Sequence, residues 1–256
     1  MNTEFASIPS NKKIYAASDF HLGAPDPEQS RNREDRIIRW INTITPSAAG
    51  LILAGDIFDF WFEYKTVVPK GSVRLLGKLA ELHAAGIPIV IFTGNHDLWM
   101  QDYLGEEIGA TIYHEPVSFK VGKLKIQIGH GDGLGPGDQK FKATKRIFKF
   151  GLNQWLFRWL HPDVGVKIAN KWSEKSKEKE LKKPKPFLGE DEPIFIHCKE
   201  TEAKTHHDYY IFGHRHLMLN MPITENSDYI NLGDWINYHS YAEISQESVE
   251  LKQFED

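Results

Sequence analysis

Acidic, amide and imidazole side chains follow five apolar stretches of the chain, at the point where each stretch stops. Together these clusters supply carboxylates, imidazoles and one carboxamide, and most of them begin with glycine. They are Asp19-Phe20-His21, Gly55-Asp56-Ile57-Phe58-Asp59, Gly94-Asn95-His96-Asp97, Gly129-His130-Gly131-Asp132 and Gly213-His214-Arg215-His216. One cluster alone is most often a turn or a helix cap, but five at strand ends predict a single shared polar site.

The donor atoms in these clusters suit a transition-metal site. Mixed nitrogen and oxygen ligands favour Mn²⁺, Fe, Zn²⁺ or Co²⁺ over Ca²⁺. An Asp-x-His or His-x-His spacing on an extended segment lets both side chains reach one site, as at Asp19 and His21 or His214 and His216. The single cysteine, Cys198, lies outside the clusters, so a structural zinc site is not expected.

Short β-branched and aromatic runs lead into these clusters and predict the strands that position them. Each run is stopped by Gly or Asp, which is typical of a buried strand followed by a turn. The predicted strands are residues 12–18, 50–54, 87–93, 123–129, 208–212 and 229–232.

Two helical patterns lie between the first three predicted strands. Residues 33–44 repeat isoleucine, and residues 73–85 repeat leucine, at helical spacing before Gly86. Alternation of strand, helix and strand predicts an α/β sandwich. Residues 218–254 look like consecutive strands and turns.

Residues from about 135 to 186 break this alternation, so we expect one domain, 1–256, with a helical cap insertion there. Residues 140–185 carry 14 Lys and Arg against 4 Asp and Glu, although the whole chain has a net charge of -4. A basic segment on an acidic body suggests an anionic partner, and a solvated helical face is the commoner alternative.

The bulk composition is that of a soluble globular protein. With one cysteine no internal disulfide can form, which favours a reducing compartment. Residues 1–13 lack the apolar core of a signal peptide, and no apolar run is long enough to cross a bilayer. The sequence therefore predicts a cytoplasmic protein that could still touch the inner membrane as a peripheral protein.

In order along the chain, the five clusters resemble the five motif blocks of calcineurin-like metallophosphoesterases. The resemblance implies a four-layer α-β-β-α sandwich and a site for two divalent metal ions, which we expect to be Mn²⁺, with Asp56 bridging both. It divides the other ligands between the two ions. By position, one ion takes Asp19, His21 and His216, and the other takes Asn95, His130 and His214.

Two metals can lower the pKa of a shared water and clamp phosphate oxygens, so the expected reaction is hydrolysis at phosphorus. His96 is the candidate catalytic residue, because as a cation it can stabilise the phosphorus centre or protonate the leaving oxygen. Asp97 could orient His96 or could be a structural cap. Asp59 is expected to support the loop rather than to bind metal.

Residues 145–160 interleave Trp and Phe with basic residues, including Trp155 and Trp159. This pattern suits an acyl-chain pocket and an interfacial membrane contact. An ordinary cap-domain core is an equal alternative, and stacking on single-stranded nucleic acid is a weaker one because the rest of the chain is acidic. We do not expect a nucleic-acid partner.

Within the larger family, the chain resembles the UDP-2,3-diacylglucosamine pyrophosphohydrolases of lipid A biosynthesis. The block from Asp56 to Trp61, the insertion after His130-Gly131-Asp132 and the residues around 167–178 carry this resemblance. It implies a lipid-linked nucleotide sugar substrate that is cleaved to UMP and 2,3-diacylglucosamine 1-phosphate. The implied substrate contacts are Asn95, Asp138, Ser176, Lys183 and His214, and the tryptophans Trp155 and Trp159 are added from the aromatic pattern.

Two residues depart from that family's pattern. Its members carry Arg where this chain has His96, and Asn where it has Glu180. A phosphate leaving group needs little protonation because its second pKa is near about 6, so Arg can act there by charge alone. Keeping His96 leaves open a broader phosphodiesterase or nucleotide phosphatase, and a metal-free binding scaffold is a third, weaker hypothesis.

Overall fold

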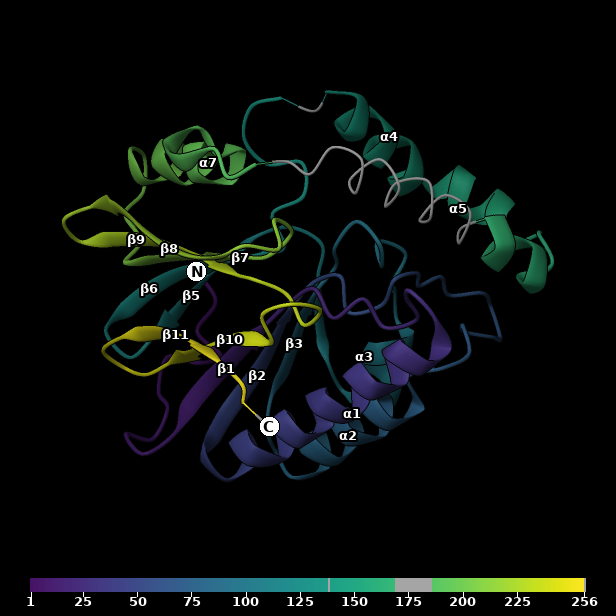
Figure 1. Ribbon diagram of the computed structural model, residues 1–256, viewed down its shortest axis with the longest axis horizontal. Helices are drawn as coiled ribbons and strands as arrows, with labels where there is room; N and C mark the ends of the chain where they lie inside the picture. Colours follow the sequence, from purple (N-terminus) through teal and green to yellow (C-terminus); the bar gives the residue numbers. More distant parts are fainter. Residues whose placement is uncertain (138, 169–185, 256) are drawn as a thin grey trace.

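Two β-sheets packed face to face form the centre of the molecule (Figure 1). The computed structural model describes residues 1–137, 139–168 and 186–255. One sheet has six strands in the order β11-β10-β1-β2-β3-β4, and the other has five in the order β5-β6-β7-β9-β8. Both sheets therefore mix strands from the two halves of the chain.

The six-stranded sheet holds the first three predicted strands side by side and parallel. Its strands are β1 (Lys13–Ala17), β2 (Ala48–Ala54), β3 (Ile89–Phe92), β4 (Thr111–Tyr113), β10 (Ser240–Ile244) and β11 (Val249–Gln253). Because β1, β2 and β3 are parallel neighbours, their carboxyl ends meet at one edge, and the first three polar clusters meet there too.

The five-stranded sheet brings the last two clusters to the same side of the sandwich. Its strands are β5 (Val117–Val121), β6 (Leu124–Ile128), β7 (Tyr209–Phe212), β8 (Met218–Thr224) and β9 (Ser227–Leu232). Strands β6 and β7 are parallel, so the residues that follow them, from His130 and from His214 onward, leave the sheet at the same edge.

Alternating side chains explain why these strands are covered on both faces. In β2, Leu51 and Leu53 point to the helices, whereas Ile52 and Ala54 point to the other sheet. A period of two residues sends neighbours to opposite faces. Since both faces are apolar, the strand is stable only between two layers.

Three helices cover the outer face of the six-stranded sheet, namely α1 (Pro27–Ile44), α2 (Val73–Ala84) and α3 (Tyr103–Ile108). Helix α1 begins six residues before the predicted start at Arg33. Its first turn is capped by Asp26, whose side chain accepts hydrogen bonds from the N–H groups of Glu28 and Gln29. Pro27 at the first helical position also favours this start, because it has no N–H to leave unpaired.

Helix α7 (Pro193–Glu202) covers the outer face of the five-stranded sheet and completes the four layers. Its Ile194, Phe195 and Cys198 pack on Tyr210 and Phe212 of β7. The sequence did not predict this helix as a layer, because its apolar stripe is short. The predicted α/β sandwich itself is confirmed.

The described part of the predicted insertion is helical and lies beside the sandwich (Figure 1). It contains α4 (Gln139–Lys149), α5 (Gly151–Phe157) and a further helical stretch at 162–168. We call residues 139–168 the insertion helices. The described helices include none with the length and apolar character that a bilayer-spanning segment requires.

Candidate metal centre

The side chains at the strand ends converge into adjoining groups, two of which consist entirely of predicted ligands. Asp19, His21 and His216 form one group, which we call half A, and their potential ligand atoms lie within 4.8 Å of one another. Asp56, His130 and His214 meet the same limit and form half B. Both groups combine residues from both sheets, so the folded sandwich is needed to assemble either one.

Asp56 belongs to half B and also lies close to half A. Its Oδ2 is 3.7 Å from Nε2 of His21 in half A and 3.3 Å from Nε2 of His130 in half B. The side chain is almost fully buried. This placement matches the bridging role implied by the family resemblance.

Buried polar atoms without a hydrogen-bond partner among the described residues mark where cations would bind. They include Oδ1 of Asp19, Oδ1 of Asn95 and Nε2 of His130. Leaving such atoms unsatisfied costs about 1–3 kcal/mol each. All three are ligand atoms of the predicted set, so the residues present fit a pair of divalent cations.

The backbone of the predicted ligands is unusual. Among the described non-glycine residues seven have positive φ, and five of these are predicted ligands. The five are Asp19, His21, Asp56, His214 and His216, with φ between 45° and 67°. Left-handed conformations cost side-chain-bearing residues free energy and cluster at functional sites. The folded sandwich therefore holds these ligands in place at a cost in stability.

Glycines let the ligand loops approach one another. A Cβ on Gly55, whose φ is +90°, would overlap the ring of His130, and a Cβ on Gly94 would overlap the carboxylate of Asp56. Neither His130 nor Asp56 can move away without leaving the site. Both glycines are thus required by packing around the ligands.

His96 lies beside half A and is oriented by Asp59. Its Nδ1 is 3.0 Å from the main-chain oxygen of Asp59 and 3.6 Å from Oδ1 of the same residue. The rings of His96 and His21 are 4.8 Å apart in a T-shaped arrangement. With Nδ1 against Asp59, Nε2 is the ring nitrogen that remains for proton transfer.

Asp97 has a different role from the orienting one considered for it. Its Oδ1 accepts a hydrogen bond from the N–H of Gly94 at 2.7 Å, and its Oδ2 accepts from Ile57 at 2.8 Å and from Phe58 at 3.4 Å. It thus ties the Asn95 loop to the Asp56 loop, which corresponds to the structural alternative. The orienting position belongs to Asp59, which the sequence placed only in a supporting role.

Burial and mutual charge set the protonation of the centre. Burial raises the pKa of Asp56, but His130, His96 and His21 outweigh it and hold the pKa well below its usual range. Burial lowers the pKa of His21, but Asp19, Asp59 and Asp56 raise it to about 10. The carboxylates and imidazoles therefore stabilise one another's charged forms. Cations would have to displace the imidazole protons.

The pKa values of His214 and Asp97 are instead shifted in the direction that favours the neutral form of each side chain. Burial and the neighbouring charge of His130 lower the pKa of His214 to about 4, so its imidazole is neutral, as a metal ligand must be. Burial and the nearby charge of Asp56 raise the pKa of Asp97 to about 7. Asp97 thus carries less charge than an ordinary aspartate near neutral pH.

Asp234 is a further residue of the centre that sequence reasoning missed. It is fully buried, and its Oδ2 lies 3.1 Å from Nδ1 of His216. Its only signal in the sequence is the Gly233-Asp234 pair after the strand 229–232, which repeats the Gly-Asp pattern of the other clusters.

The predicted substrate contacts fall into three sets. Asn95 and His214 lie in the centre, where they could touch both a cation and a substrate phosphate. Trp155 and Trp159 lie in the insertion helices with 52% and 75% of their surfaces exposed. The predicted contacts Asp138, Ser176 and Lys183 lie outside the described residues.

Aromatic contacts join the insertion helices to the catalytic loops. The ring of Phe157 lies 4.6 Å from Phe62 and 4.8 Å from Trp99. Phe62 and Trp99 each follow a catalytic-loop residue, Asp59 and His96 respectively, by three positions. The base of the insertion is therefore packed on the loops that carry the predicted chemistry.

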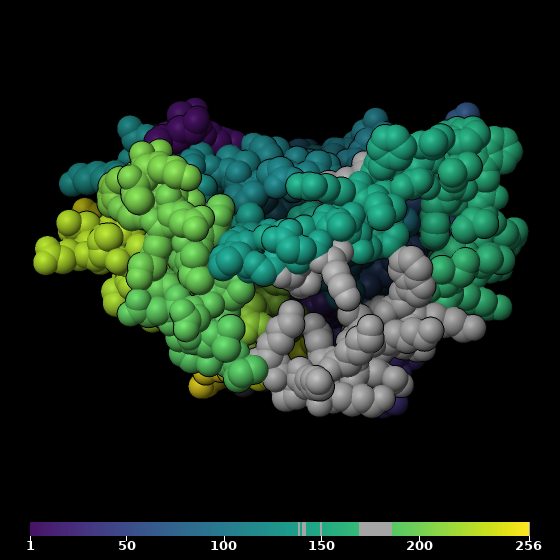
Figure 2. Space-filling model, turned by 90° about the horizontal axis from the view of Figure 1, so that it is seen from above, coloured from purple at the N-terminus to yellow at the C-terminus, as the bar shows by residue number. Residues whose placement is uncertain are grey.

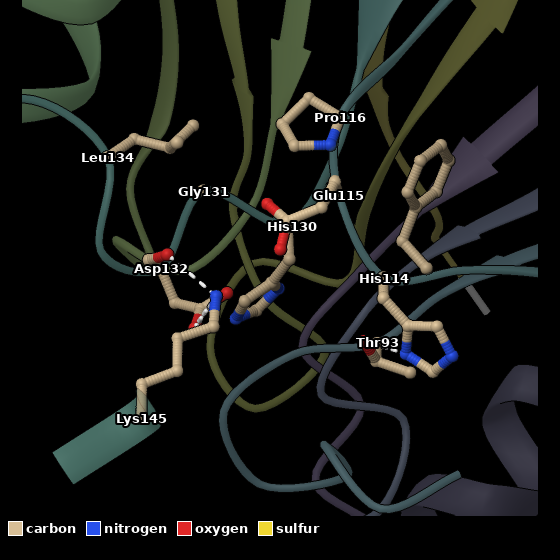
Figure 3. A pocket seen from close by; sticks show the side chains of 10 residues that line it. Thr93, His114, Glu115, Pro116, His130, Gly131, Asp132, Leu134 and Lys145 are labelled. Carbon is tan, nitrogen blue, oxygen red and sulfur yellow. Dashed lines mark hydrogen bonds and ion pairs between the residues drawn. The ribbon is translucent and has the colours of Figure 1, made fainter. Parts of the chain in front are cut away.

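An ion pair makes a second connection, close to His130 (Figure 3). Nζ of Lys145, on α4, lies 2.7 Å from Oδ2 of Asp132 and 3.1 Å from its main-chain oxygen. Thr93 and His114 line the same small pocket. The insertion thus contacts half B through charge as well as the catalytic loops through aromatic packing.

The chain belongs to the calcineurin-like phosphoesterase family, whose model matches residues 12–218. It is also similar to proteins named UDP-2,3-diacylglucosamine hydrolase. The one from Porphyromonas gingivalis (strain ATCC BAA-308 / W83) is 34% identical, over 95% of this chain and 98% of that protein. The one from Shewanella oneidensis is 26% identical, over 91% and 94%.

Among solved structures, YfcE, a phosphoesterase from E. coli, is matched at 14% identity with a TM-score of 0.44, covering 95% of this chain and 100% of that one. The family assignment rests on the sequence matches. They confirm the predicted family and the predicted reaction class, a metal-dependent phosphohydrolase.

Proposed function

We propose that this enzyme hydrolyses the pyrophosphate bond of UDP-2,3-diacylglucosamine, which releases UMP and 2,3-diacylglucosamine 1-phosphate, a step of lipid A biosynthesis. The observation that supports it most is a nearly complete alignment with hydrolases named for this substrate. The converged centre supplies the chemistry that such a reaction needs.

We assign the seven ligands as the family resemblance implies. Asp19, His21 and His216 would hold one cation, His130 and His214 would hold the other together with Asn95, and Asp56 would be shared by both. The cations, when bound, supply an activated water and neutralise phosphate charge. Mn²⁺ fits the mixed nitrogen and oxygen donors.

His96 is the proposed catalytic residue for the leaving oxygen. Asp59 fixes its ring, so Nε2 can give a proton to that oxygen or face it as a cation. Since the leaving group is a phosphate, the charge of His96 contributes more than its proton. Asp97 acts indirectly, because it holds the Asn95-His96 loop against the Asp56 loop.

The insertion helices are proposed to bind the acyl chains and to contact the membrane surface. Nine exposed large apolar side chains lie among these 30 residues, together with basic ones. Basic residues beside exposed aromatic ones favour an anionic lipid interface. Trp155 and Trp159 belong to this surface. In the space-filling view, α4 (teal) crosses the middle of the visible face and α5 (green) lies at the right, whereas α7 (light green) lies at the left (Figure 2).

The decisive test is UMP release from UDP-2,3-diacylglucosamine with Mn²⁺ and detergent. We expect rapid release from the acylated substrate and a much lower kcat/KM for the deacylated control, UDP-glucosamine. Efficient cleavage of generic phosphodiesters without UMP release from the acylated substrate would refute the proposal.

A broader phosphodiesterase or nucleotide phosphatase is the second candidate, and His96 is the observation that favours it. A histidine can protonate alkoxide leaving groups, which an arginine cannot do well. A panel of monoesters, diesters and pyrophosphates with Mn²⁺ would identify it by a kcat/KM for a non-lipid ester that equals or exceeds the lipid value.

A further inference from the structure

Three imidazoles of the metal centre, those of His216, His21 and His130, differ in what lies behind their Nδ1 atoms. In half A, Nδ1 of His216 lies 3.1 Å from the carboxylate of Asp234, and Nδ1 of His21 lies 3.5 Å from that of Asp59. In half B, Nδ1 of His130 lies 2.9 Å from the main-chain oxygen of Ala54. Half A is therefore supported by negative charge, and the His130 contact is to a neutral carbonyl.

Asp234 is rigidly held, so its direction is fixed. Its Oδ1 accepts hydrogen bonds from the N–H groups of Ile236 at 3.0 Å, Asn237 at 2.6 Å and Tyr238 at 3.2 Å. Oδ2 faces Nδ1 of His216 and also accepts a hydrogen bond from Nδ2 of Asn237 at 3.0 Å. The main-chain N–H of the next residue, Trp235, donates a hydrogen bond to the main-chain oxygen of Asp19 at 3.2 Å. This bond connects the turn to a second predicted ligand of half A.

The directly bound charges also differ between the halves. In the ligand assignment that the family resemblance implies, half A adds the carboxylate of Asp19 to the shared Asp56, whereas half B adds the neutral amide of Asn95. Asp132 acts electrostatically on His130 and His214, but it forms an ion pair with Lys145 at 2.7 Å. That pairing offsets its attraction for a cation in half B.

We propose that Asp234 is a positioning residue for His216 and that, together with Asp59, it makes half A the tighter of the two cation sites. A carboxylate behind an imidazole fixes the ring with Nε2 toward the metal and raises its basicity. The inference depends on the proposed dinuclear centre and is independent of the substrate.

Calorimetric titration of the metal-stripped full chain with Mn²⁺ tests this inference. We expect two binding steps in the unaltered protein. Asp234→Asn should weaken the tighter step by about 10–100-fold and spare the weaker one. The reason is that an amide N–H facing Nδ1 favours the tautomer with the proton on Nε2, the nitrogen needed for metal.

A matched control is Glu243→Gln on β10, which neutralises a part-buried carboxylate outside the centre that pairs with Lys13 and Lys252. Both steps should stay within about twofold of the unaltered protein, because the substitution lies away from the site. If Glu243→Gln weakens the tighter step as much as Asp234→Asn does, long-range charge accounts for the effect and the positioning role is refuted.

Which of the two cation sites binds Mn²⁺ more tightly is tested separately by Asn95→Ala. This variant tests the claim that half A is the tighter site even if Asp234→Asn does not fold. It should remove the weaker step and leave the tighter one. Loss of the tighter step in Asn95→Ala, or unchanged binding in folded Asp234→Asn, would overturn the inference. Fewer than two Mn²⁺ bound by the unaltered chain would instead refute the dinuclear centre itself.

Discussion

The sandwich buries its large apolar side chains, whereas the insertion helices expose many of theirs. In the sandwich, large residues such as Trp40 and Trp235 are fully buried between layers. Among the described residues fifteen large apolar side chains are exposed, and nine of these lie within residues 139–168. A soluble monomer rarely keeps so dense an apolar surface unless it binds something.

This difference separates two kinds of function. The sandwich holds the polar clusters in strained, well-defined positions, so its residues should affect every substrate. The insertion contacts the catalytic loops through Phe157 and Phe148, which pack on Trp99. It also pairs with Asp132 through Lys145. Its outer residues should therefore affect the lipid part of the substrate alone. The following predictions test that division, from the largest effect to the smallest.

Asp56→Asn should abolish turnover, with a loss on the order of 10³-fold or more, because the shared ligand loses its charge. Asn tolerates the left-handed backbone at this position, so folding should be retained. Turnover of the acylated substrate and of a small chromogenic diester should fall together, and bound Mn²⁺ measured by mass spectrometry should drop below two per chain. Retained activity on either substrate would contradict the bridging role.

Trp40→Ala should lower the free energy of unfolding by about 3–5 kcal/mol, since it empties a fully buried site between α1 and the sheet. Trp159→Ala is the matched change in the insertion and should cost less than about 0.5 kcal/mol, because that ring is 75% exposed. Urea denaturation measures both. Similar losses would mean that Trp159 is part of a packed core.

His96→Ala should lower kcat by on the order of 10²-fold while leaving bound metal unchanged. His96→Arg is the informative partner, because it keeps the charge and removes the titratable proton. We expect Arg to retain activity on the pyrophosphate and to lose it on an ester with a poor leaving group. Equal loss on both would show that proton donation is required for the pyrophosphate as well.

Trp155→Asp and Trp159→Asp should each lower kcat/KM for the acylated substrate by roughly tenfold, which corresponds to about 1.4 kcal/mol of lost apolar contact. The small chromogenic diester should be hydrolysed at the normal rate. An equal loss on both substrates would place these tryptophans in the structural core and remove the distinction between the two regions.

Much of the sandwich and of the metal centre could be predicted from the sequence. Short runs of apolar residues marked β1, β2 and β3, and the polar clusters follow wherever such a strand stops. Because parallel strands end at one edge, a linear pattern was enough to gather Asp19, Asp56 and Asn95 near one another. The position of each cluster at a strand end follows from the local sequence pattern, so predicting it required no knowledge of contacts between distant residues.

Helix α7 and the roles of the supporting carboxylates were decided by tertiary structure. In sequence, Asp97 adjoins His96 and Asp59 is 37 residues away, yet Asp59 contacts the His96 ring and Asp97 binds main-chain N–H groups. Asp234 reaches His216 from a different strand end. Spacing along the chain predicts where a side chain leaves the sheet. Which partner it meets depends on how the loops between strands cross, and only packing of the two sheets determines that.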